Sequence, residues 1–83
     1  MRIDKFLKIS RIIKRRAVAQ EACSGGRIEI NGKSAKPAKE VKPGDSVTVS
    51  FGDRKLCFIV LSTDEKTGKA HPEAIYKISE DTL

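Results

Sequence analysis

Seven basic side chains within the first sixteen residues carry the chemistry that this sequence offers. We call them the basic band: Arg2, Lys5, Lys8, Arg11, Lys14, Arg15 and Arg16. The planar guanidinium of arginine can donate two parallel hydrogen bonds to phosphate oxygens, and the lysine ammonium adds a more general point charge. These residue types at this density favour binding to a phosphate backbone.

Catalytic chemistry is not indicated. An enzyme needs a nucleophile beside a base, paired carboxylates or a metal cluster. His71 is the only histidine and stands in a polar stretch, which predicts a surface residue. Cys23 and Cys57 lack the CxxC spacing of a metal or redox pair, and their apolar neighbours predict small core residues in a reducing cytosol. We predict no enzyme activity, no cofactor and no bound metal.

The charge of the chain is concentrated at its beginning. The formal net charge is +6; residues 1–27 hold eight Lys and Arg against Asp4 and Glu21, while residues 28–83 hold nine charges of each sign. This imbalance predicts a polyanionic partner. Phe6 is the only aromatic residue near the band and falls on an apolar face, so stacking on single-stranded bases is not expected. Structured RNA, recognised by its phosphates and its shape, is favoured.

Membrane lipid and DNA are weaker alternatives. A membrane-surface helix needs a long apolar face, and no apolar run approaches the ~20 residues of a membrane span. The first residues, MRIDKFLK, also lack the apolar stretch of a signal peptide, so a cytoplasmic location is expected. A helix-turn-helix could use Arg15, Arg16 and Gln20, but the strand predicted directly afterwards leaves its three-helix core incomplete. We expect neither a membrane nor a DNA partner.

Two short helices are predicted to position the basic band. In a helix over residues 2–9, the apolar face comprises Ile3, Phe6 and Leu7, and the cationic face comprises Arg2, Lys5 and Lys8. Ile9 falls on the cationic side of this helix. A second helix is predicted from about residue 12 or 14 to Ser24, capped by Ser10 and ended by the following glycines. Its packing face comprises Val18, Ala19, Ala22 and Cys23, and its outer face comprises Lys14, Arg16, Ala17, Gln20 and Glu21.

A change of apolar period to two after residue 26 predicts strands. Asn31-Gly32 and the Lys-Pro-Gly-Asp stretch at 42–45 are turn signals. Alternating or apolar runs at 46–51, 56–61 and 74–78 predict further strands, the second of them central, and residues 63–72 read as a polar loop. We predict an α+β fold, with two short N-terminal basic helices packed on a small, mostly antiparallel β-sheet. It forms a single RNA-binding domain over 1–83, with a basic helical platform at 1–26 and the sheet at 27–83.

Several motifs in residues 1–50 resemble the S4-type RNA-binding domain and its αL motif. They are Met-Arg-Ile-Asp-Lys-Phe-Leu, then Ser-Arg and Lys-Arg-Arg, then Gly-Arg-Ile-Glu-Ile-Asn-Gly-Lys, then Lys-Pro-Gly-Asp. Within that superfamily the chain is similar to the RqcP family of bacterial ribosome-associated quality-control proteins. A related branch, the heat-shock ribosome-binding S4 proteins, usually has a basic C-terminal extension. The ending Ser-Glu-Asp-Thr-Leu favours the first branch.

The resemblance implies a role on large ribosomal subunits obstructed by a peptidyl-tRNA. There the family contacts large-subunit rRNA and the peptidyl-tRNA, and it supports addition of C-terminal alanines by a tailing factor of the RqcH type. It further implies that the basic band, apart from Lys14, contacts RNA, and that Asp4 orients a neighbouring arginine. The alternative that remains open is an RNA-targeting domain of an rRNA- or tRNA-modifying enzyme. A monomer is expected.

Overall fold

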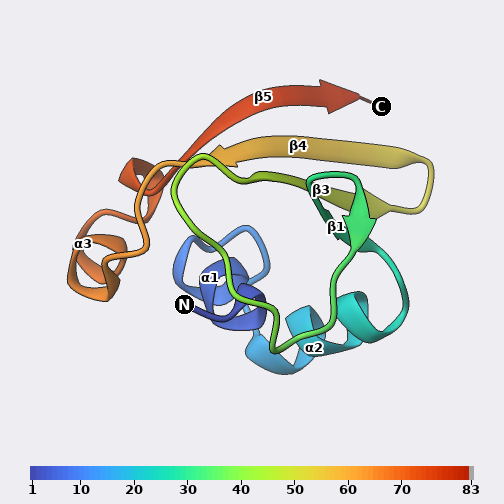
Figure 1. The fold of residues 1–83 in the computed structure, drawn as a ribbon, viewed down its shortest axis with the longest axis horizontal. Coiled ribbons are helices and arrows are strands. Elements are labelled where there is room, and N and C mark those ends of the chain that lie inside the picture. Colours follow the sequence, from blue (N-terminus) through green and yellow to red (C-terminus); the bar gives the residue numbers. More distant parts are fainter. Residues whose placement is uncertain (83) are drawn as a thin grey trace.

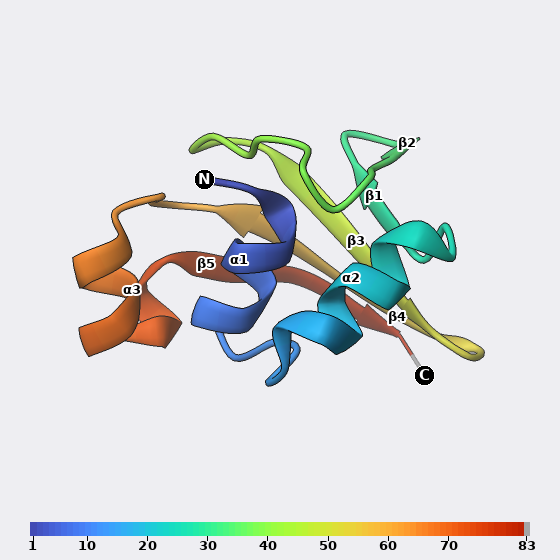
Figure 2. The same ribbon diagram turned by 90° about the horizontal axis from the view of Figure 1, so that it is seen from below.

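The fold has two layers, with helices on one side and a sheet on the other. The computed structural model describes residues 1–82. Helices α1 (Ile3–Ile9) and α2 (Arg16–Ser24) lie against one face of the sheet (Figures 1 and 2). The predicted α+β architecture, with two N-terminal helices packed on an antiparallel sheet, is confirmed.

The sheet has five antiparallel strands in the order β2-β1-β3-β4-β5. They are β1 (Ile28–Ile30), β2 (Lys33–Ser34), β3 (Ser46–Phe51), β4 (Arg54–Val60) and β5 (Tyr76–Thr82). The predicted turn between β1 and β2 is confirmed, because Asn31 and Gly32 have φ values of 53° and 84°, as a tight two-residue hairpin requires. β4, the apolar strand predicted to be central, is paired on both sides by β3 and β5, although the middle position of the sheet belongs to β3.

The core lies between α1 and the sheet. Ile3, Phe6 and Leu7, the predicted apolar face of the first helix, are completely buried. The rings of Phe6 and Phe58 stack with their centroids 5.9 Å apart, and this places α1 directly on β4. Aromatic pairs at this separation stabilise a core beyond the area that they bury. The opposite side of α1, with its lysines, is consequently turned away from the sheet.

The second helix begins later than predicted. α2 starts at Arg16, not at residue 12 or 14, and residues 10–15 form the connection from α1. Ser10 ends α1 and does not cap α2: its backbone N–H donates to Phe6 O, and its hydroxyl donates to Leu7 O at 3.1 Å. The buried side chain of Ile13 explains the late start, because it holds the connection against the core.

Three predictions of burial are wrong. Val18 was placed on the packing face of the second helix but is 47% exposed, so the face consists of Ala19, Ala22 and Cys23. Phe51 alternates with polar residues in the strand predicted at 46–51 and so was expected on its buried face together with Val47 and Val49, but it is 46% exposed, because neither α1 nor α2 reaches this end of the sheet. Ile9, assigned to the cationic side, is only 8% exposed. Its cover comes from a helix that the sequence pattern did not predict.

That helix lies in the stretch predicted to be a polar loop. α3 (Glu65–Ala70) and the short 3-10 helix η1 (Pro72–Ala74) fill residues 65–74, and the last strand starts at Tyr76, two residues later than predicted. Gly68 lets α3 approach α1, because a Cβ atom there would lie 2.5 Å from Ile9 Cγ2. A six-residue polar helix has too little apolar periodicity to be recognised, and it depends on contacts within the fold, among them its packing on Ile9 and Ile75.

Candidate RNA interface

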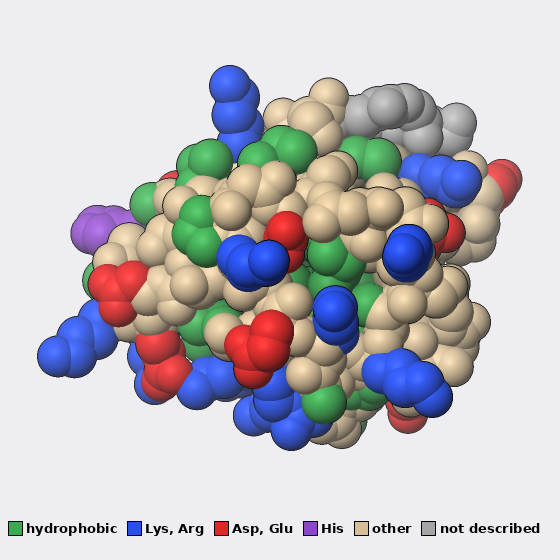
Figure 3. All heavy atoms as spheres, in the orientation of Figure 1, with side chains coloured by type: hydrophobic (Ala, Val, Ile, Leu, Met, Phe, Trp, Pro, Cys, Tyr) green, Lys and Arg blue, Asp and Glu red, His purple; other side chains and the backbone are tan. Residues whose placement is uncertain are grey.

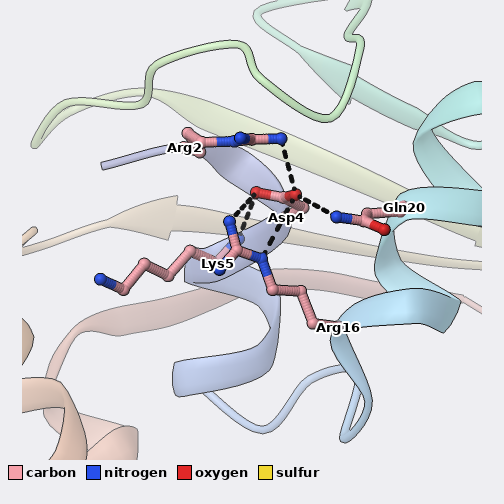
Figure 4. Close-up of polar contacts among 5 residues, drawn as sticks. All are labelled: Arg2, Asp4, Lys5, Arg16 and Gln20. Atoms are coloured by element: carbon pink, nitrogen blue, oxygen red, sulfur yellow. Dashed lines mark hydrogen bonds and ion pairs between the residues drawn. The ribbon is translucent and has the colours of Figure 1, made fainter.

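A buried carboxylate connects the two basic helices (Figure 4). Asp4 lies in the first turn of α1 and is completely buried. Its Oδ2 accepts hydrogen bonds from Arg2 Nη2 at 3.1 Å and from Gln20 Nε2 at 3.0 Å. Arg16 donates from Nε to Oδ2 at 3.4 Å and from Nη2 to Oδ1 at 3.5 Å, and the Lys5 backbone N–H donates to Oδ1 at 2.7 Å. Asp4 therefore ties the start of α2 to the start of α1.

The surroundings of Asp4 keep it ionised. Burial alone raises the pKa of Asp4, because a carboxylate loses its hydration. Hydrogen bonds from Gln20, the Lys5 backbone and Arg16, together with the charge of Arg16, outweigh burial and bring the pKa below its ordinary value of 3.8. An ionised carboxylate only accepts hydrogen bonds, which suits it to align arginine side chains.

Arg16, predicted on the outer face of the second helix, makes a contact that the prediction did not include. Its guanidinium is engaged with Asp4, although the side chain stays 41% exposed. Arg2 is 44% exposed and is held through Nη2 alone. A guanidinium has five N–H donors, so both arginines keep donors that can reach a phosphate. The predicted orienting role of Asp4 thus has the contacts that it needs, while RNA contact by Arg2 and Arg16 stays a prediction.

Lys5 is held by an acidic residue of α3. Its Nζ forms an ion pair with Glu65, and Lys69 Nζ lies 3.0 Å from the second oxygen of the same carboxylate. These two contacts, first Lys5 and then Lys69, lower the pKa of Glu65 from 4.5 to about 2. Part of the positive charge predicted for RNA at Lys5 is therefore compensated within the protein.

Three other members of the basic band border a hollow of about 430 Å³ between α1 and α3, which we call the turn hollow. It is lined by Lys8, Ile9, Arg11, Lys14, Lys69 and Pro72. Arg11 adopts the left-handed conformation, with φ of 63°, and so reverses the chain between the two helices. Lys69 was missed because residues 63–72 were read as a loop. Its spacing of four residues from Glu65 was the available signal for a helix.

The basic band is therefore two groups of side chains and not one surface. The group around Asp4 comprises Arg2, Lys5 and Arg16. The group at the turn hollow comprises Lys8, Arg11 and Lys14. Arg15, the extended residue before α2, is exposed and belongs to neither group. The second group has no carboxylate among the residues that line its hollow, so it presents the less compensated charge.

The remaining reactive side chains do not form a catalytic site. His71 is exposed, as predicted, and lies 3.8 Å from the exposed carboxylate of Glu73. Cys23 is buried; burial first, and then the charge of Asp4, raise the pKa of its thiol to about 11, so it is not a thiolate at neutral pH. Cys57 is half-buried, and both thiols are free.

Within residues 1–82, no three His, Cys, Asp or Glu side chains gather as metal ligands would. In the same part of the chain, no helix has the length and apolar character to cross a membrane.

A family model, curated relatives and a solved structure all relate this chain to proteins with an S4 domain or to ribosome-associated factors. Residues 1–47 match the S4 domain family. The chain is 47% identical to the RQC P-site tRNA stabilizing factor of Bacillus subtilis (strain 168), over 94% of this chain and 91% of that protein. It is 44% identical to the protein of the same name from Streptococcus pneumoniae, over 99% and 93%. The trimeric structure of Vibrio cholerae heat shock protein 15 superposes with a TM-score of 0.84 at 29% identity, covering 95% of this chain and 81% of that one.

Proposed function

The chain belongs to the S4-domain family and, within it, to the RQC P-site tRNA stabilizing factors, and on this premise we propose its function. It binds rRNA and peptidyl-tRNA on obstructed large ribosomal subunits and stabilises the tRNA in the P site during ribosome-associated quality control. The observation that carries this proposal is the near-complete coverage, at 44–47% identity, of relatives that bear that name. Because the chain belongs to this family, it is a binding factor and not an enzyme.

The structure supports the proposal through the exposed charge on α1, on the connection that follows it and at the start of α2. Lys8, Arg11 and Lys14 surround the turn hollow, and Arg2 and Arg16 stand beside Asp4 with donors to spare. A compact basic surface of this kind suits the phosphates and shape of folded RNA, whose base edges are hidden in a deep groove. Because the contacts are to phosphate, the binding free energy depends strongly on salt and weakly on RNA sequence.

The finer parts of the function follow from the same membership. We propose that the factor works as a cytoplasmic monomer and supports addition of C-terminal alanines by a tailing factor of the RqcH type. Stabilising the P-site tRNA would serve that factor because a tRNA held in one place is a better acceptor of each new residue. The alternative, an RNA-targeting domain of an rRNA- or tRNA-modifying enzyme, is disfavoured, since the relatives that this chain covers almost completely are named as stabilizing factors.

A charge-matched pair of double variants tests the proposal. Lys8→Gln/Lys14→Gln removes two charges from the turn hollow, and Lys66→Gln/Lys77→Gln removes two from exposed positions on α3 and β5. Each released counterion contributes about sevenfold to affinity at 0.1 M salt relative to 1 M, so two lost contacts weaken binding roughly 50-fold. We expect this loss for the first variant on isolated large subunits carrying peptidyl-tRNA, measured by sedimentation.

In cells, the first variant should also lose alanine tailing of stalled chains at an unchanged protein level. The control variant should bind and support tailing as the parent does. Equal binding by the parent and Lys8→Gln/Lys14→Gln would show that the turn hollow is not the RNA surface. Loss of tailing with unchanged subunit binding would instead separate RNA binding from cooperation with the tailing factor.

A further inference from the structure

Phosphate contacts do not by themselves distinguish RNA from DNA, because both nucleic acids carry the same phosphates. RNA differs at the ribose 2′-hydroxyl, which can both donate and accept a hydrogen bond. Basic side chains project at several separate points of the face seen in Figure 3, with acidic side chains among them. Lysine and arginine have donors but no acceptor, and they bind the phosphates of either nucleic acid. A neutral acceptor beside them can instead select RNA.

Gln20 supplies such an acceptor, and the direction of its amide is fixed. Gln20 Nε2 donates to Asp4 Oδ2 at 3.0 Å. Asp4 is completely buried and its pKa lies below the ordinary value, so it is ionised and can only accept hydrogen bonds. The NH₂ group of Gln20 must therefore face Asp4. Its oxygen is carried on the other side of the amide and points away from Asp4, as Figure 4 shows.

The amide oxygen of Gln20 is open to a ligand. Within residues 1–82, the hydrogen bond to Asp4 is the only one that the Gln20 side chain makes, so its oxygen has no partner there. In the same part of the chain no buried side-chain oxygen lacks a partner, and the oxygen of the half-buried Gln20 is consequently accessible. It can accept a hydrogen bond from a ligand while the nitrogen keeps its contact with Asp4.

Gln20 stands beside the two arginines that are predicted to contact RNA. Arg2 Nη2 and Arg16 Nε lie 3.1 Å and 3.4 Å from the same oxygen of Asp4 that Gln20 contacts, so the three side chains converge on one atom. In RNA, the 2′-hydroxyl and the phosphate that follows it are attached to neighbouring carbon atoms of the ribose. A phosphate held by Arg2 or Arg16 therefore brings a 2′-hydroxyl close to the Gln20 oxygen.

The carboxylates around this group are less suited to the same contact. Glu40 and Glu65 share a surface hollow with the two arginines, and both are already paired with cations of the protein. A carboxylate, including that of the neighbouring Glu21, also repels the phosphates on either side of a ribose. The amide of Gln20 carries no charge and accepts a hydrogen bond without this repulsion.

We propose that Gln20 accepts a hydrogen bond from a ribose 2′-hydroxyl next to a phosphate bound by Arg2 or Arg16, and that it thereby selects RNA over DNA. The inference rests on the proposed function in that its ligand is RNA. It adds to that function a residue that recognises the ribose and not the charge of the backbone. Because every ribonucleotide carries this hydroxyl, the contact reads no base sequence.

Two hairpins of one sequence and about 16 base pairs, the length that a double-stranded RNA-binding domain spans, test this contact. One carries 2′-hydroxyl groups and the other 2′-fluorine, which keeps an A-form helix but cannot donate a hydrogen bond. Fluorescence anisotropy gives the Kd for each, and the parent should prefer the hydroxyl hairpin. Gln20→Met has no amide oxygen, and Gln20→Lys can keep the contact with Asp4 but has no acceptor. In both variants the preference should fall by roughly 2–10-fold, the range for one neutral hydrogen bond.

Ala17→Lys is the matched control for Gln20→Lys, because Ala17 is exposed on the same helix and the added charge is the same. It should bind both hairpins more tightly and keep the parental preference. Circular dichroism establishes that each variant is folded; where Gln20→Met is not, Gln20→Lys decides.

The preference separates recognition from a merely structural role of Gln20, because loss of structure weakens both complexes alike. A parental preference in the folded Gln20 variants overturns the inference, even if their affinity falls. So does an equal loss of preference in Ala17→Lys, or a parent that binds both hairpins equally well. A parent that binds neither hairpin overturns the proposed function as well.

Discussion

Replacing Asp4 by asparagine should both destabilise the fold and weaken RNA binding. The substitution keeps the shape of the side chain but removes the charge that Arg2 and Arg16 share. If the remaining oxygen keeps the Lys5 backbone N–H, the new NH₂ group faces the donors of both arginines. Gln20 can turn its amide to accept a hydrogen bond, but a guanidinium has no acceptor.

The size of the effect follows from these contacts. A hydrogen bond to a charged group contributes about 1.5–3 kcal/mol, and two such arginine contacts are lost. Arg2 and Arg16 are each about two-fifths exposed, so water replaces part of the loss. We therefore expect the free energy of unfolding to fall by about 2–3 kcal/mol, which lowers the Tm of a domain of this size by roughly 10–20 °C.

Denaturant unfolding, followed by circular dichroism at several pH values, measures this effect. Because the pKa of Asp4 in the folded protein is lowered, its contribution to stability is present above its ordinary value of 3.8 and is lost as the pH falls through the folded value. The difference between the parent and Asp4→Asn should therefore be full at pH 7 and should shrink below about pH 4.

RNA binding gives a second test of Asp4→Asn, because two explanations predict opposite changes in affinity. Asp4→Asn raises the net charge from +6 to +7, so attraction to RNA by charge alone would tighten binding. If Asp4 orients Arg2 and Arg16, binding to a structured RNA hairpin instead weakens, at a temperature where the variant is folded. Tighter binding would refute the orienting role, and a change in unfolding free energy within about 0.5 kcal/mol would refute the structural one.

Four further substitutions test other parts of the reasoning. Glu65→Gln should flatten the dependence of stability on pH between 4.5 and about 2, the interval over which the parent loses this ion pair, and high salt should reduce the difference because Glu65 is partly exposed. Gly68→Ala should lower the unfolding free energy by about 1–3 kcal/mol, although alanine is the better helix former, because its Cβ would meet Ile9; a higher Tm would contradict this. Val18→Asp should leave the Tm almost unchanged, whereas Leu7→Asp should unfold the protein, and similar melting curves for the two would contradict the burial described above.

Local signals in the sequence were sufficient for most of the fold. The burial of Ile3, Phe6 and Leu7 followed from helical spacing, and the β1–β2 hairpin followed from Asn31-Gly32, because both are properties of neighbouring residues. The same holds for the concentration of basic residues in the first sixteen positions. The family could also be recognised from the sequence, because short motifs in a fixed order identify it.

Arrangements that depend on residues far apart in the chain were decided by the tertiary structure. In the sequence, Asp4 resembles any acidic residue in the first turn of a helix. Only the fold brings Arg16 and Gln20 to it, from twelve and sixteen positions away. Ile9 reads as exposed until α3 covers it. Glu40 lies in a stretch without net charge, and only the fold pairs it with the N-terminal ammonium group, thirty-nine positions away. Charge compensation and burial are set by distance in space, whereas periodicity and composition describe only neighbours along the chain.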